Sequence, residues 1–295
     1  MTIAAGFVCQ DGVVLCADTE ITAWQSKSHE SKIDFVEFDC GKAAFTYAGH
    51  VRFANCAIQK CKRRLLAGGI ENVLAEMEGI LDQEYRRNVL SHPDQATNGS
   101  LDYEILIGLV SEGDRARLYV SSQTAVQEIT SWAPIGIGCD LARHLIQHGP
   151  STVTGAVKVA AYALSEIKES APGCGGMSIY MILQNDGRHG VVTSIHDGPC
   201  KQLQDFARTY DFVTRELLMQ LANEDATDEH CEQYLREVFT QRIMEKRRQW
   251  SAVWREREEA FANVNPHLSP AEARRLHREL SLGILPAPPS PQEDS

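Results

Sequence analysis

The chain begins MTIAAGFVCQDGVVLCAD, residues 1–18, and this stretch decides the fold. Residues 2–9 form a short apolar run, and residues 13–17 form a second one. The QDG at residues 10–12 between them is a tight-turn signal. Together they predict a hairpin of two largely buried strands.

The same kind of pattern continues to about residue 200. Turn signals and β-branched runs predict strands, and apolar spacing of three and four residues predicts helices. The strands are expected at 35–38, 43–48, 103–110, 116–120, 126–132, 177–184 and 190–195, and the helices at 51–66, 70–90, 140–147 and 153–168. Strands grouped in hairpins imply antiparallel sheets rather than alternating βαβ units. An α+β fold follows, and a four-layer α-β-β-α sandwich is one of several arrangements that fit.

The chain divides into three parts by its sequence. Residues 2–200 are expected to form the α+β domain, residues 201–282 a helical extension, and residues 283–295 a disordered tail. Charges of alternating sign between Arg242 and Glu259 predict a solvated helix, with a partner-binding helix as the alternative. Ser269 followed by Pro270 resembles a helix cap with proline at the first helical position.

Composition excludes several classes of protein. The 295 residues carry 29 Lys and Arg against 40 Asp and Glu, a net charge of -11, which argues against nucleic acid or an anionic membrane as a partner. No apolar run approaches the roughly 20 residues that a membrane span needs, and residues 1–6 lack the features of a signal peptide. The nine cysteines are expected to be free, buried thiols. We therefore expect a cytoplasmic protein with no metal and no cofactor.

Thr2 is the first candidate for chemistry. A hydroxyl is a weak nucleophile that needs a base, and an α-amine, with a pKa of roughly 7.7–8.0, can accept a proton near neutral pH. If removal of Met1 makes Thr2 the first residue, one residue supplies both groups. On its own, however, a threonine at position 2 fits an ordinary strand equally well.

Three further residues suit the same chemistry. Asp18 ends the second apolar run, and Lys32 precedes an expected strand. An ammonium beside an amine and a hydroxyl lowers the pKa of both, and pairing it with a carboxylate offsets the cost of burying either charge. Gly49 lies between a strand and a helix, where a backbone N–H can face a developing oxyanion. Each residue also has a plain structural interpretation: Asp18 marks a turn, Lys32 is a solvated side chain and Gly49 is a glycine that the turn needs.

In combination these signals resemble a known family. Thr2 and Gly6, the run at residues 11–18, Thr22, Lys32 and the Ala-Gly at 48–49 are similar to the amino-terminal part of proteasome β subunits and bacterial proteasome-like peptidases. The resemblance is strong over residues 2–55, diffuse to about 200, and absent from the helical extension. It implies the four-layer N-terminal nucleophile (Ntn) hydrolase sandwich.

The resemblance also implies a role for each residue. Thr2 would be the nucleophile and, through its amine, the base, with Asp18 and Lys32 as the supporting pair and the Gly49 N–H as the oxyanion donor. Thr22 would bind an extended peptide through its backbone. The specificity pocket, suited to apolar or bulky side chains, would be lined by Ile21, Tyr47 and Val51. Peptides or unfolded proteins would be the substrates, and a homo-oligomer, in the family commonly a ring, would be the assembly.

Two later motifs depart from the family. Its Gly-Ser-Gly is here Gly136-Ile137-Gly138, so the hydroxyl that contacts the threonine amine is missing. Its Asp-x-x-Ser-Gly-Gly is here residues 171–176, with Ala171 for the Asp and Cys174 for the Ser. These losses leave two alternatives to a threonine endopeptidase: an amidohydrolase acting on small amides, and a catalytically silent scaffold.

Overall fold

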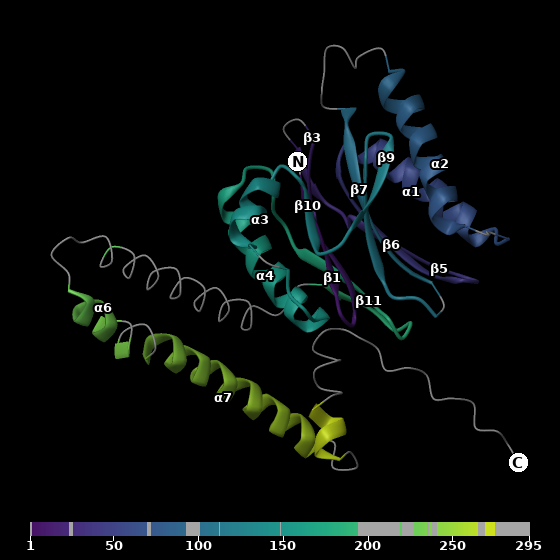
Figure 1. Ribbon diagram of the computed structural model, residues 1–295. Coiled ribbons are helices and arrows are strands. Elements are labelled where there is room, and N and C mark those ends of the chain that lie inside the picture. The colour runs from purple at the N-terminus through teal and green to yellow at the C-terminus, as the bar shows by residue number, and fades with distance from the viewer. Residues whose placement is uncertain are drawn as a thin grey trace, which may run out of the picture. The chain divides into compact units, whose positions relative to one another are not determined.

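A computed structural model gives the arrangement of the chain (Figure 1). It describes residues 2–23, 26–69, 72–92, 101–111, 113–147, 149–193, 219, 227–234, 236–237, 241–264 and 269–274. The expected tail at 283–295 and most of residues 201–226 lie outside the described residues. Within the described ranges, every helix is too short or too polar to cross a membrane.

The expected amino-terminal hairpin forms the centre of the first sheet. Strands β1 (Ile3–Cys9) and β2 (Gly12–Asp18) pair antiparallel, with Ala4 opposite Ala17. Nearly every residue of both strands is buried, as their continuous apolar runs predict. The sheet has the order β10-β1-β2-β11-β12, completed by β10 (Trp132–Gly136), β11 (Ser178–Gln184) and β12 (His189–Thr193).

The second sheet is a meander of neighbouring strands. Its order is β5-β6-β7-β8-β9, and all its pairings are antiparallel. The strands are β5 (Ile33–Phe38), β6 (Gly41–Gly49), β7 (Tyr103–Ser111), β8 (Arg117–Ser122) and β9 (Ala125–Ile129). The β5–β6 hairpin turns at Asp39 and Cys40, and its two strands confirm those expected at 35–38 and 43–48.

Small side chains let the two sheets pack against each other. Ala4 and Ala17 of the first sheet share one buried cluster with Ala44 and Ala48 of the second, together with the larger Leu106. A Cβ on Gly6 would lie 2.7 Å from a Leu118 methyl, so glycine permits this close approach. Burying each Val, Leu or Ile side chain contributes about 1.5–3 kcal/mol, which makes this interface a main source of stability.

Helices cover the second sheet on its other face. Helix α1 (Val51–Leu66) contacts β5, β6 and β7, and α2 (Val73–Tyr85) packs on α1 (Figure 1). The Asn72 side chain caps α2 by accepting from the Ala75 N–H at 3.1 Å. The sequence predicted one helix over 70–90. Instead, α2 begins after this cap and passes into a π-helical turn, η1 (Arg86–Leu90).

A second pair of helices covers the first sheet. Helix α3 (Cys139–Leu145) contacts β10 and α4, and α4 (Val153–Ser170) contacts β1, β2 and β11. The Thr152 hydroxyl caps α4 by accepting from the Gly155 N–H at 3.2 Å. Alanines and larger aliphatic residues at spacings of three and four give α4 its buried face, which includes Val153, Val157, Leu164 and Ile167. Its carboxyl end lies at the edge of the sheet where Thr2 lies.

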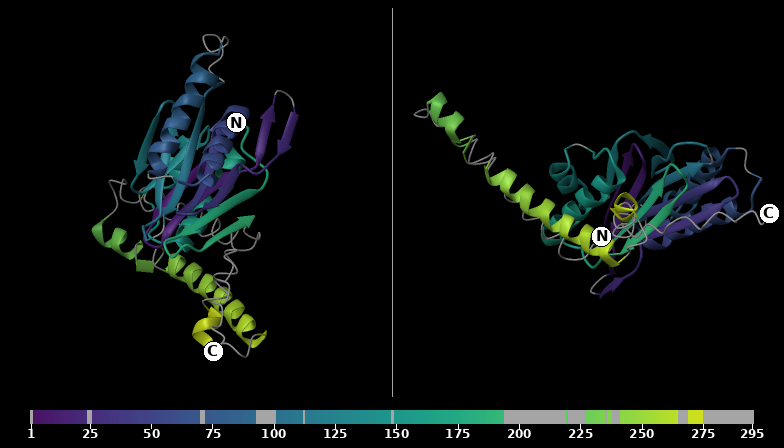
Figure 2. Two further views of the ribbon diagram at one scale, coloured as in Figure 1. Left: turned by 90° about the vertical axis from the view of Figure 1, so that its right-hand side faces the viewer. Right: turned by 90° about the horizontal axis from the view of Figure 1, so that it is seen from below.

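The strands differ in two places from those expected. The single strand predicted over 126–132 is two strands, because the chain leaves the second sheet after Ile129 and joins the first at Trp132. The hairpin of β3 (Glu20–Ala23) and β4 (Ser26–His29) was not predicted, because residues 26–29 carry no alternating apolar pattern. This hairpin projects from the rest of the amino-terminal unit (Figure 2).

Residues 196–281 form a second compact unit. Contacts divide the chain into residues 1–195 with 282–295, and residues 196–281. In the second unit the structure describes α6 (Asp228–Tyr234), α7 (Gln241–Val264) and a helical turn at 270–274. Ser269 and Glu272 form a reciprocal cap with N–H to oxygen distances of 3.0 and 3.3 Å, which confirms the predicted helix start.

Candidate active site

Thr2 lies at the edge of the first sheet where the ends of four strands, β10, β1, β2 and β11, meet. Its carbonyl accepts from the Ile137 N–H at 3.0 Å, just beyond β10, and Ile3 lies opposite Gly136. On the other side, β2 ends at Asp18, which is opposite Ser178 of β11. The order across this edge is therefore Gly136, Ile3 with Thr2 before it, Asp18 and Ser178. Thr2 itself is only 4% exposed.

Lys32 links Thr2 to Asp18. It lies just before β5, and its ammonium donates to the Thr2 Oγ1 at 2.7 Å, to the Asp18 Oδ1 at 2.7 Å and to the Glu20 carbonyl oxygen at 2.5 Å. The Lys32 and Asp18 side chains are both fully buried. An ammonium has three hydrogens, and these contacts use all three, which fixes its position.

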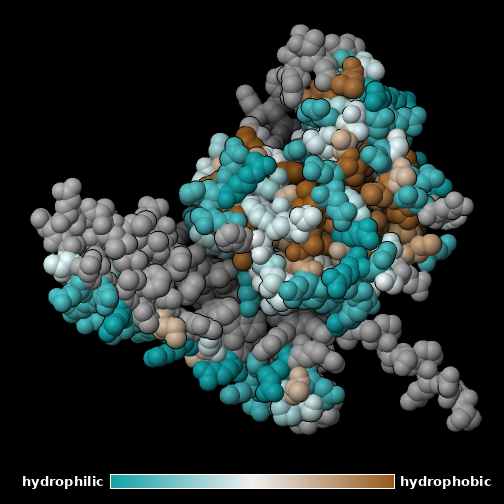
Figure 3. All heavy atoms as spheres, viewed as in Figure 1, coloured by the Kyte–Doolittle hydropathy of each residue, from teal (hydrophilic) through white to brown (hydrophobic). Residues whose placement is uncertain are grey.

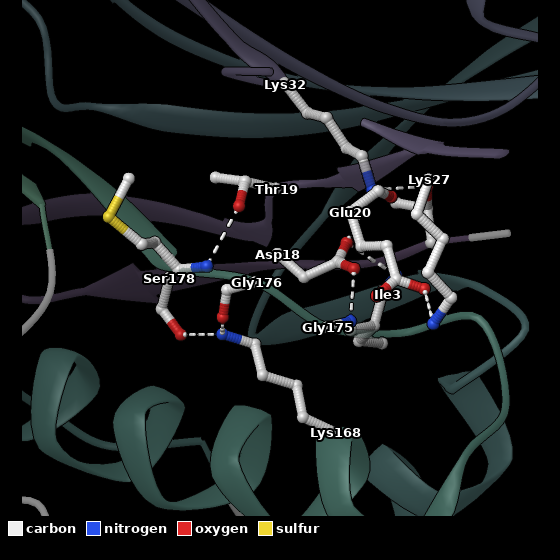
Figure 4. A network of polar contacts seen from close by, with 12 residues as sticks. Ile3, Asp18, Thr19, Glu20, Lys27, Lys32, Lys168, Gly175, Gly176 and Ser178 are labelled. Carbon is white, nitrogen blue, oxygen red and sulfur yellow. Dashed lines mark hydrogen bonds and ion pairs between the residues drawn. The ribbon is translucent and has the colours of Figure 1, made fainter. Parts of the chain in front are cut away.

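Asp18 is held from several directions (Figure 4). Its Oδ1 accepts from Lys32 and also from the Ile3 N–H at 3.3 Å, while its Oδ2 accepts from the Gly175 N–H at 2.9 Å. A buried carboxylate needs such donors, because an unpaired charge in a protein interior is strongly unfavourable. The pair is therefore a built site rather than a surface contact.

The environment of Lys32 makes its proton easier to lose. Burial lowers the pKa of the Lys32 ammonium, and the Asp18 carboxylate opposes this effect by favouring the charged form. A buried ammonium within hydrogen-bond distance of a hydroxyl stabilises the corresponding alkoxide and disfavours a second positive charge nearby.

Gly49 is the last residue of β6. Its φ is +96°, and a Cβ there would lie 2.3 Å from the Asp102 carbonyl oxygen, so only glycine fits without movement of the backbone. The preceding residue, Ala48, is near the site: a Cβ on Gly136 would lie 3.0 Å from the Ala48 Cβ and 2.2 Å from the Thr2 carbonyl oxygen. The second sheet thus presents this strand end to the start of β1.

The four residues expected to bind substrate lie on three elements. Ile21 and Thr22 are in β3, opposite Ser28 and Lys27 of β4. Tyr47 is in β6 and Val51 begins α1, and both contribute to the buried cluster beneath that helix. Burial raises the pKa of the Tyr47 hydroxyl to about 12.

The loop after α4 contains the second of the two departures from the family, at residues 171–176. Cys174 is buried, and burial, followed by the charge of Asp18, raises the pKa of its thiol to about 11. Gly175 donates to Asp18, as described above. The Met177 N–H donates to the Thr19 Oγ1 at 2.9 Å, and the Thr19 N–H donates to the Met177 carbonyl at 3.0 Å. The loop therefore contacts the acidic member of the site in spite of its changed sequence.

Lys168 was not predicted from the sequence. It lies in the last turn of α4, where a lysine is ordinarily a solvated partner of the helix dipole. Its ammonium donates instead to the Gly176 carbonyl at 2.8 Å and to the Ser178 Oγ at 2.6 Å (Figure 4). Burial lowers its pKa, and the Asp18 carboxylate opposes that shift. Its position three residues before the absent Asp was the only sequence signal.

Apolar side chains flank the same edge. Ile137 is 52% exposed and Met177 is 56% exposed, although both are large and hydrophobic. Figure 3 shows that such residues reach the surface of the amino-terminal unit among hydrophilic ones. The two residues lie beyond the ends of β10 and before the start of β11, on either side of Thr2 and Asp18.

Comparisons with known proteins identify the fold. No protein-family model and no curated protein sequence matches the chain. Solved structures do. A Gly-1 mutant of Anbu from Hyphomicrobium sp. strain MC1 is 14% identical with a TM-score of 0.57, covering 77% of this chain and 100% of that one. Anbu from Yersinia bercovieri, described as an ancestral beta-subunit, is 13% identical with a TM-score of 0.57, at 77% and 100% coverage.

A third structure agrees with these two. The Anbu complex from Pseudomonas aeruginosa, a helical assembly, is 12% identical with a TM-score of 0.61, covering 78% of this chain and 100% of that one. At such low identity the likeness concerns the fold and not the activity. The chain has an α/β fold with antiparallel sheets, similar to that of Anbu, the ancestral beta-subunit.

Proposed function

We propose that this protein is an N-terminal-threonine hydrolase that cleaves peptide bonds. One observation carries the proposal: the buried Lys32 ammonium lies 2.7 Å from both the Thr2 Oγ1 and the Asp18 Oδ1. A buried Lys–Asp pair is difficult to explain as a source of stability, since apolar residues of similar volume stabilise a fold at least as well. We also assign the fold as the four-layer Ntn-hydrolase sandwich, which the paired sheets and helices support.

The reaction begins with Thr2 as the first residue of the mature chain. Lys32 donates to the Thr2 hydroxyl oxygen, so the hydroxyl hydrogen is left to point elsewhere, and the α-amine of the same residue can accept it. The oxygen attacks the carbonyl carbon of the substrate, and the Gly49 N–H donates to the oxyanion that forms. The amine then passes the proton to the leaving nitrogen, which gives an ester that water hydrolyses.

Lys32 and Asp18 make this chemistry possible near neutral pH. The ammonium lowers the pKa of both the Thr2 amine and its hydroxyl by like-charge repulsion and by stabilising the alkoxide. The Asp18 carboxylate favours the charged form of the ammonium and so opposes the effect of burial on its pKa. The site thus holds a neutral amine, which can act as the base, beside a positive lysine, which stabilises the developing negative charge.

We propose that an extended peptide pairs with β3 at Thr22. In the described part of the chain β3 pairs only with β4, so one edge of this strand is available for strand addition. The pocket for the substrate side chain before the cleaved bond would be lined by Ile21, Tyr47 and Val51. Such a pocket favours apolar or bulky side chains. We further propose a homo-oligomer, because the Anbu complex from Pseudomonas aeruginosa forms a helical assembly.

A peptide α′,β′-epoxyketone tests the proposal, because its stable adduct requires both a hydroxyl and an adjacent amine. The mature protein should have the intact mass of a chain that starts at Thr2, and the reagent should add once. Thr2→Val keeps the shape but removes the hydroxyl, and should stay unlabelled. Adding one glycine before Thr2 should also prevent labelling, because the amine is then amidated. A protein that starts at Thr2 and is not labelled would instead be a silent scaffold.

The exposed Ile137 supports a second candidate function, an amidohydrolase on small amides. It occupies the position at which the family has a serine, so the threonine amine lacks that hydroxyl. A panel of peptides and acyl amides of matched acyl group distinguishes the two functions. Turnover of small amides alone would overturn the peptidase.

A further inference from the structure

The side chain of Lys168 reaches from α4 to the loop beside Asp18. Its ammonium donates to the Gly176 carbonyl and to the Ser178 hydroxyl, at 2.8 and 2.6 Å. Ser178 is the residue opposite Asp18 in the β2–β11 pairing. In Figure 4, Lys168 and Lys32 approach this region from opposite sides. The helix is thereby tied to the strand end that carries the carboxylate.

The loop that Lys168 holds is in direct contact with the candidate active site. The Gly175 N–H donates to the Asp18 Oδ2 at 2.9 Å, and the Gly175 carbonyl accepts from the Glu20 N–H at 3.2 Å. Glu20 is also the residue whose carbonyl accepts from Lys32. A single glycine therefore contacts both the carboxylate and the backbone that position the Lys32 ammonium.

Packing leaves this loop in one narrow position. A Cβ on Gly175 would lie 2.4 Å from the Glu20 Oε2, and a Cβ on Gly176 would lie 2.4 Å from the Thr19 Oγ1. Gly176 also has a φ of +69°, which favours glycine. A loop packed so closely on one side needs a matching restraint on the other, and Lys168 supplies it from α4.

We propose that Lys168 is a positioning residue of the active site, which holds the Gly175–Met177 loop so that the Gly175 N–H fixes Asp18 against Lys32. This inference rests on the proposed function. The family motif has an Asp where this chain has Ala171, and Lys168 lies one helical turn before it. Without the Lys168 ammonium, the Gly176 carbonyl loses a charged donor and the bond from Gly175 to Asp18 loosens.

Lys168 also acts on the site through its charge. The groups that face its ammonium are Asp18 and Cys16 of β2, Lys32 and Cys174. Like charges disfavour each other's charged form, so removal of the Lys168 charge raises the pKa of Lys32. The direct bond from Lys32 to Asp18 at 2.7 Å does not involve Lys168, so the looser Gly175 contact lowers that pKa by less. A residue that only stabilised the fold would leave the titration of the site unchanged.

Lys168→Met tests the inference, with Lys158→Met on the same helix as the control and Lys168→Arg as the conservative variant. A hydrogen bond to a charged group typically corresponds to about a 10- to 100-fold effect, so we expect kcat to fall by that factor while KM stays nearly constant. Hydrogen exchange of the Gly175 amide should accelerate by a similar factor. The pH profile of kcat/KM should move to higher pH, and Lys168→Arg should restore part of the activity.

The exchange measurement separates this inference from the proposed function. If the wild type turns over no substrate and takes up no electrophile, the function is wrong, and Gly175 exchange alone then judges the positioning. If Gly175 exchange is unchanged in Lys168→Met, the inference is overturned. It is also overturned if the wild type is active and Lys168→Met exchanges faster at Gly175 but keeps the wild-type kcat and pH profile. Should Lys168→Met fail to fold, Lys168→Gln keeps a donor for Gly176 without the charge and is expected to shift the pH profile in the same direction.

Discussion

The Lys32 Nζ lies 2.7 Å from the Thr2 Oγ1 and 2.7 Å from the Asp18 Oδ1, so one buried ammonium joins the first strand to the carboxylate that ends the second. Lys32→Met removes it and leaves Asp18 buried without a cation. We expect a loss of about 3–5 kcal/mol in the free energy of unfolding, measured by urea denaturation, and a fall in kcat/KM of about 10²–10⁴.

The matched control for Lys32→Met is Lys62→Met. Lys62 pairs with Asp34 at 2.5 Å, but both side chains are partly exposed. A pair that solvent reaches contributes much less than a fully buried one, about 0–1 kcal/mol at the surface, so this variant should stay close to the wild type in stability and activity. Equal effects of the two substitutions would show that the buried pair has no special role.

Asp18→Asn should change the pH dependence of the reaction. Burial lowers the pKa of Lys32 and the Asp18 carboxylate opposes that shift, so without the carboxylate the pKa of Lys32 falls further. Activity needs the lysine charged and therefore falls as pH rises through its pKa. The alkaline limb of the kcat/KM profile should move to lower pH. Asp34→Asn, on the outer side of β5, should leave the limb in place, and an unmoved limb in Asp18→Asn would contradict the role of the pair.

Gly49→Ala should lower both stability and activity. With φ at +96° and the Asp102 carbonyl oxygen 2.3 Å from the new Cβ, the backbone must shift. Such strain costs about 1–3 kcal/mol, and displacement of the oxyanion donor should lower kcat by about 10²–10³. Gly79→Ala is the control, because nothing lies within 4 Å of its Cβ in α2. That variant should gain up to about 1 kcal/mol from helix propensity and keep its activity.

Cys174 should be unreactive although it lies beside the site. The residue is 6% exposed and its thiol has a pKa of about 11, so little thiolate forms at pH 8. Iodoacetamide should modify the exposed Cys40 of the native protein and leave Cys174 intact, whereas both should react in denaturant; peptide mass mapping distinguishes them. Rapid alkylation of Cys174 with loss of activity would indicate a cysteine nucleophile instead.

The parts of the fold that the sequence predicts are those with local patterns. The first hairpin and α1 have continuous apolar runs or helical spacing, and both have the expected positions. The crossing from β9 to β10 depends on pairing between Ala4 and Ile135, which are far apart in the chain, and no local signal marks it. The strand β4 was missed for a different reason, because its sequence Ser-Lys-Ser-His is polar and has no alternating apolar pattern.

The candidate site was predictable only where the resemblance extends. Thr2, Asp18 and Lys32 are weak signals singly, and the structure brings them within hydrogen-bond distance. The sequence does not single out Lys168, because a lysine in the last turn of a helix is ordinarily explained by its interaction with the helix dipole. Its partners, Gly176 and Ser178, become its neighbours only when β11 pairs with β2.

Ile137→Ser separates the two enzymatic candidates. The Ile137 N–H already donates to the Thr2 carbonyl at 3.0 Å, so a serine there would carry its hydroxyl on the segment that adjoins the threonine amine. Because the Ile137 side chain is 52% exposed, the free energy of unfolding should change by no more than about 0.5 kcal/mol. Peptide kcat/KM should rise several-fold as the amine is oriented, while Ile137→Ala, which removes bulk without adding a donor, should give no such rise. A peptidase limited only by that missing hydroxyl must gain from its return, whereas an amidohydrolase adapted to Ile137 should lose turnover of small amides and gain none on peptides.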